Sequence, residues 1–339
     1  MKVLITGGGG YIGVVLTECL LNAGNHVSCL DRFFLGKDKI ESFLKNPLYK
    51  TIQADVRTFD KSLLQGFDVV IDLAALSNDP LGQLVADKTY AINYEGRLRV
   101  CRLAKEMGVK RYILASSCSV YGLNESDCDE TSKPNPISTY AKANLKSEEV
   151  LSLKQDDFCV TVLRFATVFG VSARMRFDLA VNLMTLKAFK EGVIDVLGQG
   201  MQWRPFVHLR DVAGTIEHVM KSDQNKVNGQ IFNVGENRNN MKIINLAYLI
   251  REILPFEIQV RIIPDDPDKR SYKVNFDRIH SVLGLKMRYE IEDGVKEIYE
   301  ALKKGSIWDY PDTFTVKWYK YLLDSEVILK DVILDNTLL

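Results

Sequence analysis

KVLITGGGGYIG, residues 2–13, is the stretch that decides the fold. Its first part, Lys2–Thr6, is a largely apolar run that predicts a buried strand, and a helix is expected over residues 11–23. Glycines between a strand and a helix allow a sharp turn and let a pyrophosphate approach the backbone N–H groups of the helix N-terminus. The GxxGxxG spacing therefore predicts a dinucleotide site rather than a flexible turn. The residues assigned to it are Gly7, Gly10, Tyr11, Ile12 and Gly13.

The first half of the chain alternates short apolar runs with longer amphipathic stretches. This pattern is typical of a parallel sheet covered by helices on both faces. Further strands are expected at residues 26–30, 50–54, 67–73, 111–116 and 158–165, with helices at 87–107 and 138–153. After Gly170 the pattern changes, and the elements expected there are a basic helix over 174–192, a strand over 193–197 and a return to the main sheet at 231–235.

The expected fold class is α/β, a Rossmann-type doubly wound parallel sheet with a smaller C-terminal α/β substrate lobe. A chain of 339 residues exceeds one ordinary core, which agrees with two intergrown units. The dinucleotide-binding domain is expected over residues 1–170 with a return segment at about 205–235, and the lobe over 171–204 and 236–339. The apolar tail, 325–339, is expected either to cap the lobe or to touch a neighbour.

Composition and charge narrow the function classes. The chain is 46% hydrophobic and 26% charged, with a formal net charge of +0. No basic excess points to nucleic acid, and no run approaches the ~18 apolar residues that predict a membrane span. The N-terminus lacks the apolar length of a signal peptide, so the cytoplasm is the expected location. The charge of an anionic substrate must then be met by a few local arginines.

The six cysteines form no CxxC pair, and several lie inside apolar runs. Buried free thiols in a reducing compartment fit this better than a disulfide framework or a zinc site. The four histidines are scattered, and no metal site is predicted.

Asp31 ends the second expected strand, roughly 20 residues after the glycines, where a carboxylate binds the adenosine ribose hydroxyls. The carboxylate would repel a 2′-phosphate, which favours NAD over NADP. Arg32 complicates this choice, because an arginine at that place can accept NADP. Both residues are assigned to the cofactor.

Four further motifs follow in order: Asp55-Val56-Arg57, Leu73-Ala74-Ala75, SSCSVYG from Ser116, and Tyr140 at an expected helix start. Together with the glycine loop they resemble the extended short-chain dehydrogenase/reductase family of nucleotide-sugar epimerases, dehydratases and reductases, over residues 1 to about 280. The resemblance implies NAD as cofactor and a nucleotide-diphosphate sugar as substrate. The further cofactor residues that it implies are Asp55, Val56, Leu73, Ala74, Ala75, Asn93, Ser116, Tyr140 and Asn144.

In this family hydride moves between sugar and nicotinamide while a tyrosine takes or returns a hydroxyl proton. Tyr140 matches that tyrosine, and Ser117 matches the serine or threonine that assists it. Free tyrosine has a pKa near ~10, so it needs nearby positive charge to act as a base. The family supplies this charge with the nicotinamide and with a lysine four residues later on the same helix face. Here that residue is Asn144, which is uncharged and is counted with the catalytic set.

Asn144 leaves three interpretations open. The site is slow or is assisted by a water or another cation, the residue was changed deliberately to trap a complex, or the protein binds without turnover. Lys142 and Lys146 point roughly 200° and 240° round the helix from Tyr140 and are no natural substitutes.

The two residues after Ser117 bear on the reaction type. Family members that eliminate water carry an Asp-Glu pair there, whereas this chain has Cys118 and Ser119. That argues against a 4,6-dehydratase and leaves epimerisation through a transient keto-sugar, or reduction of a keto-sugar. Cys118 is either a proton donor in an epimerisation or, as we favour, a packed thiol.

Arginines are candidates for the substrate diphosphate, because a guanidinium forks onto phosphate oxygens and stays charged. In relatives, arginines matching Arg204 and Arg270 clamp this group; the alternative is ordinary surface arginine. Thr167 stands where many relatives have a sugar- or phosphate-contacting asparagine. The full candidate substrate set is Ser77, Ser117, Cys118, Ser119, Thr167, Arg174, Arg176, Arg204 and Arg270.

The favoured interpretation is an NAD-dependent nucleotide-sugar epimerase, which keeps its cofactor. One alternative is an NAD(P)H-dependent 4-keto nucleotide-sugar reductase, which consumes it. A second, from another class, is a non-catalytic NAD-binding protein, which Asn144 alone favours. Relatives commonly pair two helices from each subunit into a four-helix bundle, so the resemblance implies a homodimer through residues 87–107 and 138–153.

Overall fold

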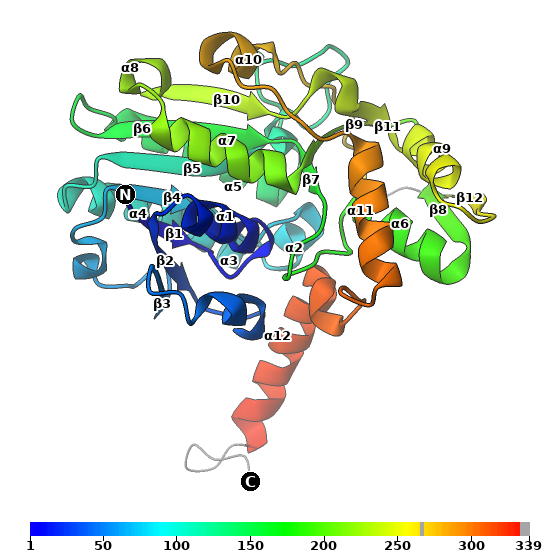
Figure 1. Cartoon of the computed structure of the whole chain (residues 1–339), viewed down its shortest axis with the longest axis horizontal. Coiled ribbons are helices and arrows are strands. Elements are labelled where there is room, and N and C mark those ends of the chain that lie inside the picture. Colours follow the sequence, from blue (N-terminus) through cyan, green and yellow to red (C-terminus); the bar gives the residue numbers. More distant parts are fainter. Residues whose placement is uncertain (265–267, 333–339) are drawn as a thin grey trace.

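The computed structural model describes residues 1–264 and 268–332. Its centre is a seven-stranded parallel sheet with the order β10-β6-β5-β4-β1-β2-β3 (Figure 1). The strands are β1 (Lys2–Thr6), β2 (His26–Asp31), β3 (Tyr49–Gln53), β4 (Val69–Asp72), β5 (Arg111–Ser117), β6 (Cys159–Phe165) and β10 (Gln230–Val234). The strand order reverses between β1 and β4, and ligands of open α/β sheets bind at such a point. The predicted Rossmann-type α/β fold is confirmed.

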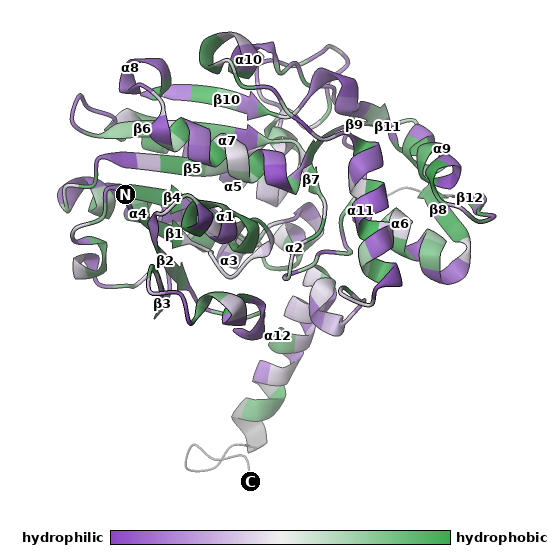
Figure 2. Cartoon of the chain, viewed as in Figure 1, coloured by the Kyte–Doolittle hydropathy of each residue, from purple (hydrophilic) through white to green (hydrophobic). Residues whose placement is uncertain are grey.

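Helices cover both faces of this sheet. One face carries α1 (Tyr11–Asn22) and α7 (Leu209–Lys221), and the opposite face carries α4 (Arg97–Glu106). Along β1 the side chains alternate between the two cores, with Val3 and Ile5 in one and Leu4 in the other. Burial on both faces explains why the strands are continuous apolar runs. Figure 2 shows the hydrophobic strands inside helices whose outer faces are polar.

The helix expected over residues 87–107 is divided. It consists of α3 (Ala86–Tyr90), a π-helical stretch (Ala91–Gly96) and α4, and a short helix, α2 (Asp79–Leu84), precedes it. In the π-helical stretch the side-chain amide of Asn93 hydrogen-bonds both the N–H and the C=O of Leu76, at 2.8 and 3.0 Å. The helix expected over 138–153 is α5 (Thr139–Ser147), continued by a 3₁₀ helix (Glu148–Leu153).

The helix expected over residues 174–192 starts only at Ala180, as α6 (Ala180–Glu191). The prediction is wrong for the residues before it because tertiary contacts hold them in a non-helical path. Arg176 and Asp178 form a buried ion pair, and the backbone N–H of Phe177 donates to Thr313 near the far end of the chain.

A second core lies beside the carboxyl ends of the main sheet. It includes Phe177, Phe206, Leu246 and Val295, from four separate segments. The remaining elements are β7 (Thr167–Phe169), β8 (Val193–Leu197), β9 (Trp203–His208), α8 (Gln224–Val227), β11 (Asn240–Lys242), α9 (Ile243–Ile253), β12 (Gln259–Ile263), α10 (Asp277–Leu283) and α11 (Ile291–Lys303). The strand predicted at 193–197 and the return to the main sheet at 231–235 are both present as β8 and β10.

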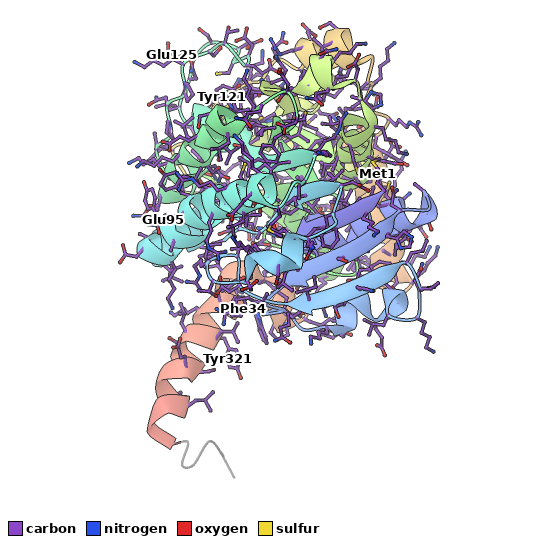
Figure 3. All side chains as sticks on the ribbon, turned by 90° about the vertical axis from the view of Figure 1, so that its left-hand side faces the viewer. Met1, Phe34, Glu95, Tyr121, Glu125 and Tyr321 are labelled. Atoms are coloured by element: carbon purple, nitrogen blue, oxygen red, sulfur yellow. The ribbon has the colours of Figure 1, made fainter. Side chains whose placement is uncertain are left out.

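The last helix, α12 (Thr315–Val332), extends away from the body of the molecule (Figures 1 and 3). Its first turns are anchored, because Trp318 Nε1 donates to the carbonyl of Phe34 at 2.8 Å and Tyr319 packs edge-on against the Phe34 ring. The predicted tail at 325–339 is helical to Val332, and residues 333–339 lie outside the described residues.

No helix in the described ranges combines the length and the apolar character needed to cross a bilayer. The six cysteines are all free thiols; Cys19 is partly buried and the other five are buried.

Candidate active site

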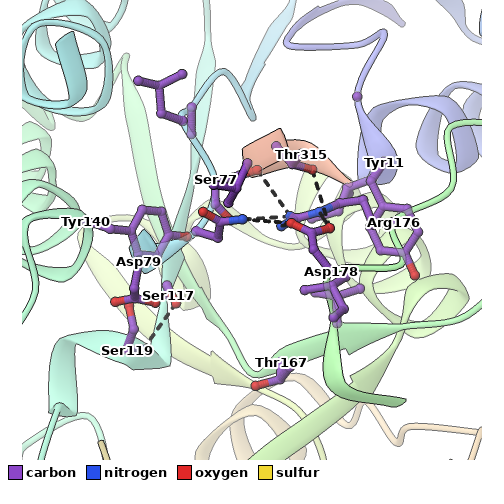
Figure 4. Close-up of a pocket in the computed structure, with 18 of the residues that line it drawn as sticks. Tyr11, Ser77, Asp79, Ser117, Ser119, Tyr140, Thr167, Arg176, Asp178 and Thr315 are labelled. Carbon is purple, nitrogen blue, oxygen red and sulfur yellow. Dashed lines mark hydrogen bonds and ion pairs between the residues drawn. The ribbon is translucent and has the colours of Figure 1, made fainter. Parts of the chain in front are cut away.

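A cavity of about 850 Å³ opens at the carboxyl ends of the parallel strands. Its walls come from the glycine loop, the ends of β2 and β5, the segment after β4 and the second core. Figure 4 shows Tyr140, Ser117 and Asp79 on one side, with Arg176 and Asp178 across from them. The topology thus brings residues from the whole chain to the strand ends, where α/β folds bind ligands.

The glycine loop has the geometry that its spacing predicts. Gly7 has a φ of 70°, in the left-handed region that only glycine adopts without strain. A Cβ on Gly13 would lie 2.6 Å from the carbonyl oxygen of Gly7, so α1 packs directly on the loop. All five predicted loop residues line the cavity. The Tyr11 hydroxyl also donates to the carbonyl of Gly170 at 2.6 Å, which ties the loop to the second core.

Asp31 lies at the end of β2 with its carboxylate held by the backbone. One oxygen accepts from Gly9 N at 3.0 Å and the other from Phe33 N at 2.7 Å. Burial raises the pKa of Asp31, while these N–H donors act in the opposite direction. Each carboxylate oxygen keeps a further lone pair, which suits two ribose hydroxyls.

Arg32 is engaged with other groups. Its guanidinium donates to Asp55 at 2.9 Å and lies 4.4 Å from the centre of the Phe34 ring. Asp55 also accepts from Arg57, and this pairing lowers the pKa of Asp55 to about 2. Arg32 therefore shares the carboxylate of Asp55 with Arg57.

Tyr140 and Ser117 meet at the cavity wall. Ser138 caps α5 by accepting from Ala141 N at 3.1 Å, which places Tyr140 in the first turn, and Ser117 ends β5. Burial raises the pKa of Tyr140 and the charge of Asp79 raises it further, whereas Arg97 and a hydrogen bond from Ser117 lower it. The two predicted catalytic side chains thus lie on the same side of the cavity.

Three predicted site residues are not among those that line the cavity, namely Asn93, Cys118 and Asn144. Asn144 accepts from Arg97 and donates to the carbonyl of Tyr140. The Cys118 thiol is directed to the carbonyl of Arg164, and burial raises its pKa well above the ordinary value. This placement supports the packed thiol over the proton donor.

Ser119 lines the cavity, and its hydroxyl is buried without a hydrogen-bond partner among the described residues. A buried hydroxyl without a partner costs free energy, so a ligand atom at this place would satisfy it. The other predicted cofactor residues, Asp55, Val56, Leu73, Ala74, Ala75 and Ser116, also line the cavity, as do Ser77 and Thr167.

All four predicted arginines reach the same cavity, in two groups. Arg204 and Arg270 both pair with Asp268, and Arg270 also pairs with Asp79. Asp268 and Asp79 were not predicted as site residues; only the position of Asp79 after the fourth strand could have indicated its place.

The second group is Arg174 and Arg176. Arg176 forms a two-point ion pair with Asp178 and donates to the Ser77 hydroxyl at 3.1 Å. Arg174 is 3% exposed, and burial together with Arg176 lowers its pKa to about 10. Its Nη2 donates to the Thr315 hydroxyl at 3.0 Å, so the start of α12 completes this wall. No sequence pattern indicated the role of Thr315, because it is 141 residues from Arg174.

Known proteins are similar to this chain in sequence. UDP-glucuronic acid decarboxylase 1 of Danio rerio is 27% identical over 315 residues, which cover 89% of this chain and 73% of the relative. YtcB of Bacillus subtilis (strain 168), described as an uncharacterized UDP-glucose epimerase, is 28% identical over 259 residues, 73% of this chain and 81% of the relative.

Two solved structures have the same fold. UDP-glucuronic acid 4-epimerase from Bacillus cereus, in complex with UDP-glucuronic acid and NAD, has a TM-score of 0.80 at 23% identity, covering 90% of this chain and 99% of that one. UDP-N-acetylglucosamine 4-epimerase from Methanobrevibacter ruminantium M1 has a TM-score of 0.81 at 24% identity, covering 90% and 98%. The model of the NAD dependent epimerase/dehydratase family matches residues 3–235, and this chain belongs to that family.

Proposed function

We propose that this protein is an NAD-dependent nucleotide-sugar epimerase that acts through a transient keto-sugar. The observation that carries the proposal is the placement of Tyr140 and Ser117 on one side of a cavity that the glycine loop also lines. YtcB and the Bacillus cereus enzyme, both described as epimerases, support the choice of reaction.

The residues present fit NAD. Gly7, Gly10 and Gly13 line the cavity without side chains that would keep a pyrophosphate from the backbone, and Asp31 retains acceptor capacity for ribose hydroxyls. Bound NAD would supply a hydride acceptor that also returns the hydride. The carboxylate of Asp31 favours NAD over NADP, because it would repel a 2′-phosphate.

Tyr140 removes the proton of a sugar hydroxyl as its carbon is oxidised and returns that proton when the carbon is reduced. Ser117 hydrogen-bonds the same oxygen and holds it against the tyrosine. Inversion requires that the keto-sugar present its other face while the nucleotide diphosphate stays bound. The volume of about 850 Å³ gives room for this, and the Arg204–Arg270 and Arg174–Arg176 pairs would hold the diphosphate.

The same proposal includes the assembly and the domains. Residues 1–170 with the return segment form the cofactor domain, and 171–204 with 236–339 form the substrate lobe. The homodimer is proposed to form through the helices of residues 87–107 and 138–153. In Figure 3 the helical face that carries Glu95 is turned to the viewer. Sedimentation of the purified chain tests the dimer, and charge reversal of Glu95 should weaken it.

The test of function is a panel of UDP-, GDP-, CDP- and dTDP-sugars incubated with the protein and NAD, with products identified by NMR and reduced nicotinamide followed by absorbance. We expect one sugar to be inverted with no net redox change and Tyr140→Phe to lose on the order of 10²–10⁴ in rate. In a parallel incubation of 4-keto nucleotide-sugars with NADH or NADPH, stoichiometric loss of the reduced cofactor would instead establish a keto-sugar reductase. Cofactor binding without conversion of any sugar would refute the epimerase.

A further inference from the structure

Arg97 brings a positive charge to the place where Asn144 leaves none. It is the first residue of α4 and is 2% exposed. Its Nη1 donates to Asn144 Oδ1 at 2.8 Å, and its Nε donates to the carbonyl of Ala74 at 3.0 Å. Arg97 lines the cavity whereas Asn144 does not, so the arginine is the member of the pair that faces the ligand space.

The guanidinium of Arg97 is buried without a counter-ion. Both of these acceptors are neutral oxygens, and no carboxylate in the described part of the chain forms an ion pair with it. Arg164 shows the ordinary arrangement, because it is 3% exposed and pairs with Glu148 at 2.7 Å. A buried cation that is not directly paired with a carboxylate is costly, so its place at a cavity suits an anion that forms there.

Tyr140 lines the same cavity and is the residue proposed above to become an anion during the reaction. Asn144 Nδ2 donates to the carbonyl of Tyr140 at 2.9 Å, so one amide links the guanidinium to the first turn of α5. Burial and Asp79 raise the pKa of Tyr140, and the charge of Arg97 is the first of the groups that lower it. The pKa of Tyr140 is raised overall, and the charges of Arg97 and Arg176 oppose that rise, which is the direction that a catalytic base requires.

We propose that Arg97 supplies the positive charge that stabilises the Tyr140 phenolate, and that Asn144 is the neutral link that positions it. The inference rests on the acid–base role proposed for Tyr140. It explains why residue 144 is neutral: a lysine there would place a second buried cation against Arg97, and like charges disfavour each other. Arg97 acts on Tyr140 through the electrostatic effect of its charge, and Asn144 holds the guanidinium in place.

The test measures the ionisation of Tyr140 directly. The full chain, saturated with NAD, is labelled with 3-fluorotyrosine, and the Tyr140 signal in the ¹⁹F NMR spectrum is the one missing from Tyr140→Phe. We expect Arg97→Gln to raise the pKa of this residue by about one unit or more and Arg97→Lys to raise it less. The pH–rate profile should move to higher pH by the same amount.

Arg99→Gln is the matched control. Arg99 lies two residues along α4 and donates to the carbonyls of Val56 and Phe59, so its loss removes the same kind of backbone contacts without touching Asn144. The Tyr140 pKa should not move in this variant. An equal pKa in the parent and in Arg97→Gln would overturn the proposal.

If Arg97→Gln fails to fold, a second comparison uses Asn144→Lys alone and Asn144→Lys combined with Arg97→Gln. Asn144→Lys alone should lower the melting temperature, because it buries two cations together, and adding Arg97→Gln should restore both the melting temperature and the Tyr140 pKa of the parent. If Asn144→Lys melts at the same temperature as the parent, and adding Arg97→Gln does not raise that temperature, the proposal is contradicted.

The two proposals fail separately. The pKa of Tyr140 can be measured without turnover. If Arg97→Gln shifts this pKa while the parent converts no sugar, the charge effect of Arg97 is supported and the epimerase proposal fails. If the parent converts a sugar and Arg97→Gln leaves the Tyr140 pKa unchanged, the epimerase proposal is supported and the charge effect of Arg97 is refuted.

Discussion

A Cβ on Gly82 would lie 2.9 Å from the Cβ of Tyr140, so α2 and the first turn of α5 are in direct contact at the proposed acid–base residue. Asp79, the first residue of α2, accepts from Ser138 at the cap of α5 and pairs with Arg270 from the substrate lobe. One short helix therefore joins the tyrosine to an arginine proposed to hold substrate.

Gly82→Ala should displace Tyr140, because the methyl would also lie 3.0 Å from its backbone nitrogen. We expect kcat to fall at least tenfold, because the proposed acid–base residue would be moved away from the sugar hydroxyl. Gly214→Ala is the control: Gly214 lies inside α7 with nothing near its added Cβ, and alanine there should leave activity unchanged and stability equal or higher by up to ~1 kcal/mol. Equal kcat in both variants would show that the contact does not position Tyr140.

Asp31→Ala should weaken NAD binding roughly tenfold or more, because a charged acceptor typically contributes ~1.5–3 kcal/mol to its hydrogen bonds. The preference for NAD over NADP should shrink at the same time, since the repulsion of a 2′-phosphate is removed. Calorimetric titration of both dinucleotides measures this. Arg32→Ala should change NAD affinity far less, and tighter binding of NADP than NAD by the parent would show the cofactor preference to be wrong.

Glu148→Gln should be strongly destabilising. Glu148 is 7% exposed, accepts two hydrogen bonds from Arg164 and one from Ser116, and its neutralisation leaves a buried guanidinium without a counter-charge. Loss of one partner of a buried pair costs about 3–5 kcal/mol. Urea unfolding of Glu106→Gln gives the comparison, because the pair of Glu106 with Lys61 is exposed and should contribute nothing measurable. Equal midpoints for the two variants would contradict this account.

Local pattern was enough to predict the cofactor half. Val3, Leu4 and Ile5 are buried on both faces of a parallel sheet, so their run is apolar throughout, and the demands of a tight turn select Gly7 and Gly13. These signals lie within a few residues of each other and need no knowledge of the rest of the fold.

Long-range contacts explain what the sequence did not predict. The basic pattern of residues 174–179 suggested a helix. Instead, the backbone N–H of Phe177 donates to the carbonyl of Thr313, 136 residues away, and this segment is not helical. The charge absent at Asn144 comes from Arg97, 47 residues earlier, and no spacing rule on α5 could indicate it. The Phe177–Thr313 and Arg97–Asn144 contacts both join residues that are distant in the sequence and come together only in the folded chain.

The most direct test of the account follows the hydrogen on the inverted carbon. A nucleotide-sugar converted in the panel is prepared with deuterium at each ring carbon in turn and incubated with the protein and NAD. If Tyr140 moves the hydroxyl proton while the hydride leaves and returns within one cavity, the epimer keeps its deuterium at the inverted carbon, and no reduced nicotinamide accumulates. Loss of that deuterium to water, or product formed only with stoichiometric consumption of reduced cofactor, would contradict the central claim.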